Sequence, residues 1–330
     1  MNQQLAKYTK YFQTLKQGYS KGLGKAPHKP VLLLSVIQLI QNGSIRSPKV
    51  YVSPELVTAF QTNWEALVIT AHIPTFSLPF FHLKNEKGDF WNLVTWNGLD
   101  KLTTTSRSIK SFKMLEEEVR YAELAPDLFQ LLTNPVHAAY LTEVLLATYF
   151  PATKQAYDAE GLEKRYTQLA DEMLQEPAET YQTKMKWFQE KPSKEIYQIE
   201  RYVRSDVFKK TIPKLYQHRC CISGMQVQTG LPIQMVDACH IIPFKTSLDD
   251  TVTNGFSLSP TLHRAFDRGL IGVDDDYRVI VSPVVTEQPS VYAISQFQGA
   301  ELLLPKEPAY HPSQAAFAWH RSQVFVKGKR

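Results

Sequence analysis

Apolar side chains along the first 150 residues are spaced as in helices for most of their length. Near the N-terminus they recur three or four positions apart, at Leu5, Tyr8, Tyr11, Phe12 and Leu15, which predicts an amphipathic helix. The run HKPVLLLSVIQLIQ predicts a buried helix closed by Asn42 and Gly43, and Pro54 suits the first turn of the next helix. MLEEEVRYAEL and residues 135–150 predict two further helices.

One segment of this region has the pattern of strands. The aromatic runs TFSLPFFHL and DFWNLV flank the polar stretch NEKGD, which predicts a strand, a turn and a strand. Residues 151–200 are rich in Glu, Lys and Gln, whereas short apolar runs after about residue 202 are typical of a small α+β unit. The predicted fold class is α+β, with a mixed helical and β domain over 1–150, a helical linker over 151–200 and a second domain over 201–330.

Composition places the chain among folded, water-soluble proteins. Apolar residues make up 43% of the 330 and aromatic residues 12%, enough for real hydrophobic cores. No stretch approaches a membrane span and the N-terminus does not resemble a secretion signal, so we expect a cytoplasmic protein with no membrane segment. Cys220, Cys221 and Cys239 are too few for a disulfide framework and lack the paired CxxC of a structural zinc site. We expect them to be small buried residues.

The net charge of +5 hides a strong segmentation along the chain. Residues 1–113 carry a net charge of +9, residues 114–200 a net charge of −8 and residues 201–330 a net charge of +4. Two basic ends suit a polyanionic partner such as DNA, because neutralising phosphates releases counterions. Ordinary scatter of charges is the alternative explanation.

A short, loop-rich segment carries the candidate chemistry. Within residues 237–270, His240 and His263 lie on either side of Asn254, with Asp237 and Asp267 close by. IQMVDACH predicts a strand, GFSLS a return strand, and SPTLHRAFDRG a short helix capped by its first serine. A ββα unit of this kind brings the two histidines to one site although 23 positions separate them.

These residue types suit the hydrolysis of a phosphodiester bond. The reaction needs a base to activate water, a cation to neutralise charge on the phosphate oxygens, and a group that orients the base. Histidine exchanges a proton near neutral pH, so His240 can take the proton from water. His263, aided by a carboxylate, can hold a divalent cation, and Asn254 can hydrogen-bond across the loop and fix the strand end.

The arrangement resembles the HNH nuclease family, whose fold is called ββα-metal. The resemblance rests on His240 of DACHIIP, Asn254 of TNGFSLS and His263 of TLHRAFDRG, with the flanking CISG, HRAFDRGLI and WHRSQVF segments, and covers about residues 200–330. It implies that His240 is the general base, that Asn254 stabilises the loop, and that His263 binds one divalent cation, Mg²⁺ or Mn²⁺, per active site. We expect no structural zinc.

The chain departs from the family pattern at one position. Many members place Asp directly before the first histidine as a metal ligand, whereas this chain has Cys239 there. The second ligand is therefore open between Asp237 and Asp267. Alternation along a strand would put Asp237 on the face opposite the base, so a twist or bulge would be needed for both to serve one site.

The N-terminal segments GKAPHKPVLLLSVIQLI and FSLPFFHL resemble the sulfur-binding domains of type IV restriction enzymes, over about residues 1–150. Those domains recognise DNA whose backbone carries a phosphorothioate, and they commonly precede an HNH nuclease. Sulfur is larger, more polarizable and less hydrated than the oxygen it replaces, so an apolar cup favours it. The resemblance implies three cup residues and three phosphate-holding residues: Leu78, Pro79 and Phe80, then His28, Lys29 and Arg107. In the family, Arg is frequent at the position of Lys29 and an aromatic residue at that of Leu78.

Together the two resemblances predict a modification-dependent type IV restriction endonuclease that cuts double-stranded DNA near a phosphorothioate. One site per chain must cut two strands, so we expect a homodimer, with residues 151–200 as a candidate dimer surface. Two alternatives stay open. One is an HNH nuclease specific for methylated or otherwise modified bases, with an aromatic cage for a flipped base drawn from Phe80, Phe81, Phe90 and Trp91. The other is a DNA-binding protein whose ββα unit has lost catalysis.

Overall fold

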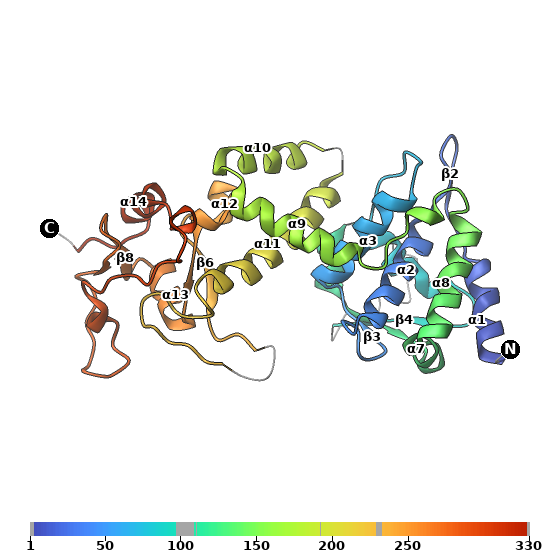
Figure 1. Cartoon of the computed structure of the whole chain (residues 1–330), viewed down its shortest axis with the longest axis horizontal. Coiled ribbons are helices and arrows are strands. Elements are labelled where there is room, and N and C mark those ends of the chain that lie inside the picture. Colours follow the sequence, from blue (N-terminus) through green and yellow to red (C-terminus); the bar gives the residue numbers. More distant parts are fainter. Residues whose placement is uncertain (1–2, 97–108, 110, 192, 229–232, 329–330) are drawn as a thin grey trace. The chain divides into compact units, whose positions relative to one another are not determined.

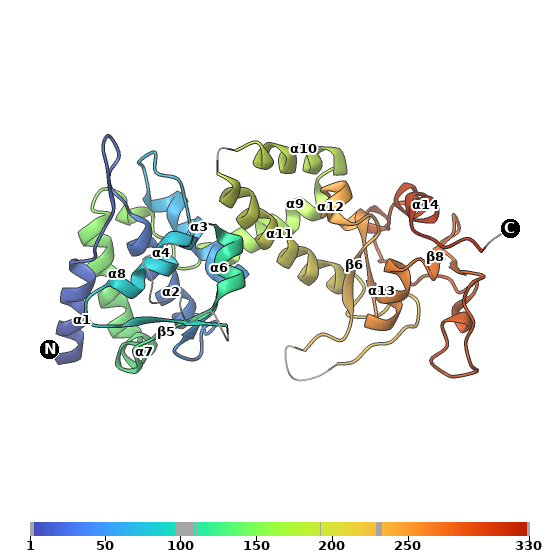
Figure 2. The same cartoon turned by 180° about the vertical axis from the view of Figure 1, so that it is seen from behind.

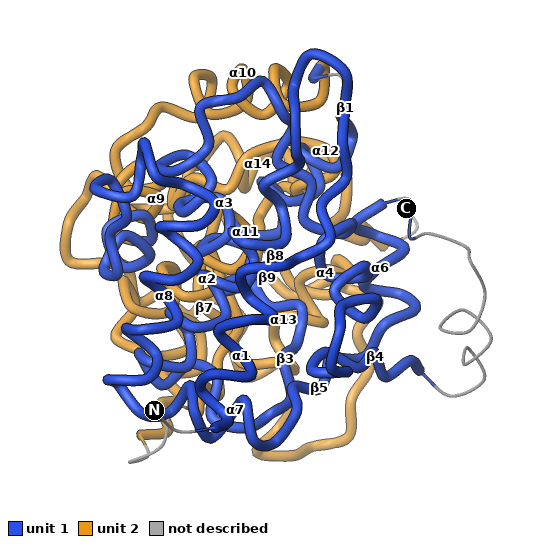
Figure 3. Tube along the Cα trace, turned by 90° about the vertical axis from the view of Figure 1, so that its right-hand side faces the viewer, with its two compact units in different colours: residues 1–166, 191–203 blue, residues 167–190, 204–330 orange. Residues whose placement is uncertain are grey.

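The computed structural model describes residues 3–96, 109, 111–191, 193–228 and 233–328. The chain divides into two compact units, coloured separately in Figure 3: residues 1–166 with 191–203, and residues 167–190 with 204–330. Residues 161–215 form α9 (Gly161–Gln175), α10 (Ala178–Gln189) and α11 (Lys194–Leu215). Helices α9 and α11 each contribute to both units, whereas α10 belongs to the second. The functional boundaries at 150 and 200 stay predictions.

The first unit packs helices around a small antiparallel sheet. Its buried α2 contacts α3, α4, α7 and α8, as can be followed in Figures 1 and 2. The predicted helices near residues 3–16, 28–41, 54–67 and 135–150 are confirmed. The helices are α1 (Gln3–Gln13), α2 (His28–Gln41), α3 (Pro54–Leu67), α4 (Ser77–His82), α6 (Phe112–Glu118), α7 (Pro126–Thr133) and α8 (Pro135–Tyr149), with the 3₁₀ turns η1 (Leu83–Asn85) and η2 (Lys154–Ala156).

The sheet of this unit has the strand order β3, β5, β4, with β5 antiparallel to both neighbours. Its strands are β3 (Lys49–Val50), β4 (Trp91–Thr95) and β5 (Val119–Leu124), and a separate hairpin pairs β1 (Tyr19–Ser20) with β2 (Gly24–Lys25). The prediction of one helix over MLEEEVRYAEL is wrong in its second half. Residues 119–124 pair with both β3 and β4, and pairing with two strands favours an extended chain there.

The prediction of a strand over TFSLPFFHL is also wrong, because this run forms α4. Phe76 and Phe80 lie one helical turn apart, and both side chains pack in the core. The side chain of Glu195, far along the chain, accepts hydrogen bonds from the backbone N–H groups of Phe76 and Ser77, each 2.8 Å long. This carboxylate satisfies donors that the start of a helix leaves free. The strand predicted in DFWNLV is confirmed as β4.

The second unit contains the predicted ββα arrangement. Strands β6 (Asp237–His240) and β7 (Gly255–Leu258) form an antiparallel pair, and α13 (Pro260–Asp267) packs against both. The remaining elements are α12 (Phe244–Ser247), η3 (Val252–Asn254), β8 (Ile271–Val273), β9 (Val279–Val281), η4 (Ile294–Phe297), η5 (Pro308–Tyr310) and α14 (Gln314–Gln323).

Over the described part of the chain, no helix is both long enough and apolar enough to cross a bilayer.

Candidate active site

Strand β6 and helix α13 carry most of the side chains that the sequence singles out. The register pairs His240 with Gly255, so the end of β6 lies beside the start of β7. A side chain at Gly255 would collide with Phe208 of α11, because an added Cβ would lie 2.6 Å from its ring. Ser259 precedes α13, Pro260 occupies its first turn, and Gly269 follows it with a φ of +67°. Local sequence therefore sets both ends of the helix that carries His263.

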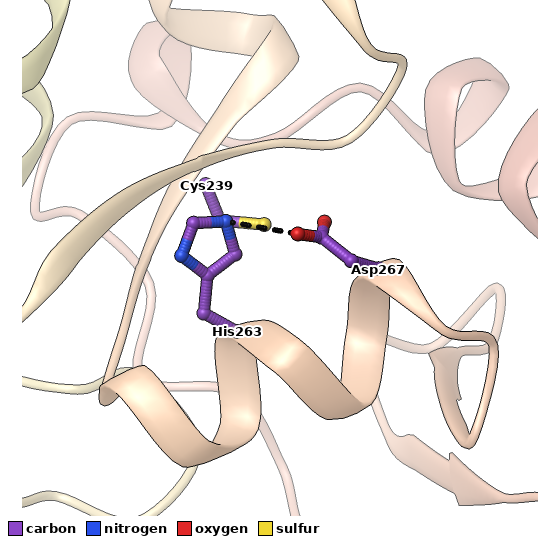
Figure 4. A group of neighbouring side chains, drawn as sticks. All are labelled: Cys239, His263 and Asp267. Carbon is purple, nitrogen blue, oxygen red and sulfur yellow. Dashed lines mark ion pairs between the residues drawn. The ribbon is translucent and has the colours of Figure 1, made fainter.

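Three potential ligand atoms meet between β6 and α13. The thiol of Cys239, the imidazole of His263 and the carboxylate of Asp267 lie within 4.8 Å of one another. Figure 4 shows Cys239 reaching the group from the strand, while the other two come from successive turns of the helix. The distance from His263 Nε2 to Asp267 Oδ2 is 3.5 Å. Sulfur, nitrogen and oxygen donors this close together can hold one divalent cation.

Asp237 contacts the same histidine from the other side. Its Oδ2 accepts a hydrogen bond from His263 Nδ1 at 3.1 Å. A metal-binding histidine ordinarily donates its second N–H to a carboxylate, which fixes the ring and leaves the other nitrogen for the ion. The geometry therefore suits Asp237 to orienting His263 and Asp267 to binding the ion. These are different roles for the two carboxylates between which the sequence leaves the second metal ligand open.

The sequence analysis predicted Cys239 to be a small buried residue that stands where many HNH nucleases have a metal-ligating Asp, and it did not propose the thiol as a ligand. The structure does bury all three cysteines and leaves them without disulfides, but it also places Cys239 in the ligand group. Alternation along β6 puts Cys239 and Asp237 on one side of the strand, facing α13. Burial raises the pKa of the Cys239 thiol, and the nearby Asp267 carboxylate raises it further. A cation at this site would bind the thiolate and displace its proton.

His240 belongs to a neighbouring group of side chains. Its ring stacks on Phe208 with the centroids 3.9 Å apart, and its Nε2 donates a hydrogen bond to Asp250 Oδ1 at 2.7 Å. His240 directly follows Cys239 in β6, so the two groups are joined through the end of this strand. The alternation considered for Asp237 is present: the carboxylate contacts α13, whereas His240 contacts α11 and the loop before β7. Sequence reasoning missed Asp250 entirely.

Asn254 braces the loop between β6 and β7. Its Oδ1 accepts a hydrogen bond from Ile242 N at 2.9 Å, and its Nδ2 donates to Ile242 O at 2.9 Å and to Asp249 O at 3.0 Å. The side chain is buried. These hydrogen bonds cross the loop as expected from the sequence, and they fix the chain directly after His240.

Replacing Asn254 by alanine is expected to loosen this loop. Three backbone groups would lose their partner, and each unsatisfied buried group costs about 1–3 kcal/mol. Hydrogen exchange measured by mass spectrometry should show faster exchange in the peptide that spans Ile242 and Asp249. Asn254→Asp keeps the acceptor for Ile242 N but removes the donors, so it should fall between the wild type and Asn254→Ala. Unchanged exchange in both variants would contradict the bracing role.

A pocket of about 550 Å³ in the first unit contains several residues that the sequence assigned to DNA reading. Leu78, which is 39% exposed, and Pro79 form part of its wall. The polar part of its lining includes His28, Lys29, His72, His82 and Lys16. His28 Nε2 donates a hydrogen bond to Ile73 O at 2.8 Å. Burial lowers the pKa of both His28 and His82, so these rings are mostly uncharged at neutral pH.

Two of the expected DNA-reading residues differ from their assigned surroundings, and a third is not described. Phe80 is fully buried between Phe76 and Trp91 and does not line the pocket. Lys29 forms an ion pair with the buried Glu86, so its charge is already balanced within the unit. Arg107 lies outside the described residues. Sequence reasoning missed His82 and Glu86; the only available signal was the position of His82, one helical turn after Leu78.

The comparison with protein families agrees with this description of the ββα arrangement. Residues 220–274 match the HNH_2 family model, described as HNH endonuclease. Among solved structures, the chain is similar to a modification-dependent TagI restriction endonuclease with 22% identity and a TM-score of 0.27. That match covers 38% of this chain and 41% of the other, less than half of either. No curated protein matches the chain significantly.

The family match and the ββα geometry fall on the same residues. Residues 220–274 therefore form an HNH endonuclease domain. HNH nucleases generally depend on a metal ion, and the group formed by Cys239, His263 and Asp267 offers suitable ligands.

Proposed function

We propose that this protein is a modification-dependent type IV restriction endonuclease that recognises phosphorothioated DNA with its first unit and hydrolyses nearby phosphodiester bonds with its second. The observation that carries this proposal is the coexistence of an HNH domain with a separate pocket whose wall is partly apolar and partly basic. Non-specific scission would endanger the host genome, so a nuclease of this kind needs a second site that selects its target.

In the proposed mechanism, His240 accepts the proton of the attacking water. Asn254 holds the loop after His240, so that the base keeps its place relative to the strand end. Asp267 and Cys239, with His263, would hold the divalent cation, and Asp237 would orient His263 through Nδ1. A bound cation would stabilise the charge that develops on the phosphate oxygens. The protein supplies the proton acceptor and the fixed geometry.

The first-unit pocket suits a weakly hydrated anion better than an ordinary phosphate. Leu78 offers exposed apolar surface, and the mostly buried Pro79 adds to the same wall; such a wall favours a large polarizable sulfur over a strongly hydrated oxygen. Because His28 and His82 are mostly neutral and Glu86 balances Lys29, Lys16 adds positive charge without making the pocket strongly cationic. We therefore assign Leu78 and Pro79 to the sulfur atom, and we leave Phe80 out of the cup.

Matched plasmids, one phosphorothioated and one not, test this function directly. With Mg²⁺ or Mn²⁺ present, we expect the wild type to cut only the modified plasmid. Leu78→Asp places a charge in the apolar wall and is expected to weaken binding of a phosphorothioated duplex about 10-fold or more, close to its affinity for plain DNA. Leu303→Asp, an exposed leucine of the second unit, is the matched control. Equal cutting of both plasmids would keep the nuclease and reject sulfur recognition.

Recognition of a modified base is less well supported. The four rings considered for an aromatic cage, Phe80, Phe81, Phe90 and Trp91, are all buried in the core of the first unit. A flipped base needs an open pocket with accessible ring faces, so these rings cannot receive one without repacking.

The proposal includes a homodimer on DNA, because one active site per chain must cut two strands. Sedimentation of the protein bound to a short modified duplex should give a complex that contains two protein chains per duplex. Monomers alone on DNA, together with double-strand scission, would contradict this part.

A further inference from the structure

The imidazole of His240 is held by a carboxylate to which neither sequence motif assigns a role. Its Nε2–H donates to Asp250 Oδ1 at 2.7 Å, and the Asp250 side chain is only 1% exposed. The ring lies almost parallel to Phe208, with 7° between the two planes. The stack fixes the plane of the imidazole, and the hydrogen bond fixes which of its edges faces Asp250.

Asp250 is in turn held by helix α10, which is labelled in Figure 1. The hydroxyl of Tyr181 donates to Asp250 Oδ2 at 3.2 Å. Burial raises the pKa of Tyr181 and the Asp250 carboxylate raises it further, so this hydroxyl stays protonated and can only be a donor to that carboxylate. Both carboxylate oxygens of Asp250 therefore have partners.

A buried cation completes this arrangement. The guanidinium of Arg204, from α11, lies 5.2 Å from the centre of the Tyr181 ring and donates to Glu172 of α9 at 2.9 Å. Glu172 also accepts from Lys184 of α10. Residues of three helices thus fix the tyrosine that holds Asp250, and all of them belong to the second unit.

We propose that Asp250 is a positioning residue for the general base and that Tyr181 of α10 holds Asp250 in place. The inference rests on the proposed role of His240. It assigns the proton of the resting imidazole to Nε2, which leaves the Nδ1 lone pair to accept the proton from water. When Nδ1 takes that proton the imidazole becomes a cation, and the carboxylate 2.7 Å from Nε2 stabilises it. Residues 167–190 then serve catalysis rather than only linking two domains.

Kinetics of an isosteric variant test the positioning role. Asp250→Asn keeps the shape of the side chain but removes its charge, and we expect kcat to fall about 10- to 100-fold while KM stays within about 2-fold, as for partners that orient a functional histidine. Tyr181→Phe should lower kcat by a smaller factor. Asp274→Asn is the matched control, because Asp274 belongs to the same unit and its carboxylate accepts hydrogen bonds from Asp276 N and Arg278 N rather than from His240. An equal loss in the control, or an unchanged kcat in Asp250→Asn, would overturn the proposal.

A spectroscopic measurement tests the hydrogen bond between His240 and Asp250 without requiring DNA cleavage. Nitrogen-15 spectra of histidine-labelled full-length protein should show the Nε2–H tautomer for His240, assigned by its absence in His240→Ala. Asp250→Asn should shift that tautomer toward Nδ1–H. An Nδ1–H tautomer in the wild type would overturn the proposal even if the variant fails to fold. If the wild type cuts no DNA, the proposed function fails, whereas the tautomer still tests the bond between His240 and Asp250.

Discussion

Replacing His240 by alanine is expected to abolish DNA cleavage while leaving DNA binding intact. General-base catalysis by a positioned side chain is worth about 10²–10⁴-fold in rate, and the variant removes the only group that we assign to proton abstraction. His240 lies in the second unit, whereas the pocket assigned to recognition lies in the first. Single-turnover cleavage of a modified plasmid and fluorescence anisotropy on a short modified duplex measure the two properties separately.

His218→Ala is the matched control for this experiment. His218 also belongs to the second unit, but it is exposed, and its ring contacts Gln234 near the surface. We expect its cleavage rate to stay within about 2-fold of the wild type, as for surface substitutions away from a site. A His240→Ala protein that still cuts at a comparable rate would show that another group activates the water. Loss of binding together with cleavage would instead place His240 in DNA recognition.

The parts of the fold that sequence predicted correctly are those with strong local signals. The helix that carries His263 has a serine at its N-cap position, a first-turn proline and a terminal glycine within eleven residues, although the serine side chain makes no capping hydrogen bond. Strands β6 and β7 are bounded by breaks in the apolar pattern. The segment TFSLPFFHL lacked such signals. A short apolar run fits a buried helix as well as a strand, and the carboxylate of Glu195 that satisfies the start of α4 is 118 positions away. No local pattern contains that contact.

The candidate site shows the same division between local and distant information. His240, Asn254 and His263 were found because their order and spacing follow a motif. Asp250, although only ten positions from His240, carried no motif, and its importance comes from a hydrogen bond that only the folded loop creates. Tyr181 comes from a segment whose composition predicted a linker. Cys239 was recognised as a departure from the family, but its place beside His263 and Asp267 depends on how α13 packs against β6.

Replacing His263 by alanine is expected to abolish both metal binding and cleavage. His263 supplies the nitrogen ligand between Cys239 and Asp267, and its removal leaves two ligands that come from different elements. A catalytic cation contributes several kcal/mol to the transition state, so cleavage should fall by more than about 100-fold. Cobalt titration followed by absorption measures binding independently of activity, because Co²⁺ reports its ligands by its spectrum.

Cys239 variants then establish which ion the site prefers. Soft thiolate ligands favour ions such as Zn²⁺ and Co²⁺, whereas carboxylates favour Mg²⁺ and Mn²⁺. If Cys239 is a ligand, the wild-type cobalt complex should absorb in the near ultraviolet through a sulfur–metal bond, and Cys239→Ser should lose that band. Cys239→Asp, which restores the carboxylate found in many HNH nucleases, should shift activity toward Mg²⁺. A wild-type spectrum without the band would leave His263 with Asp267 as the ligands and Cys239 as a packing residue.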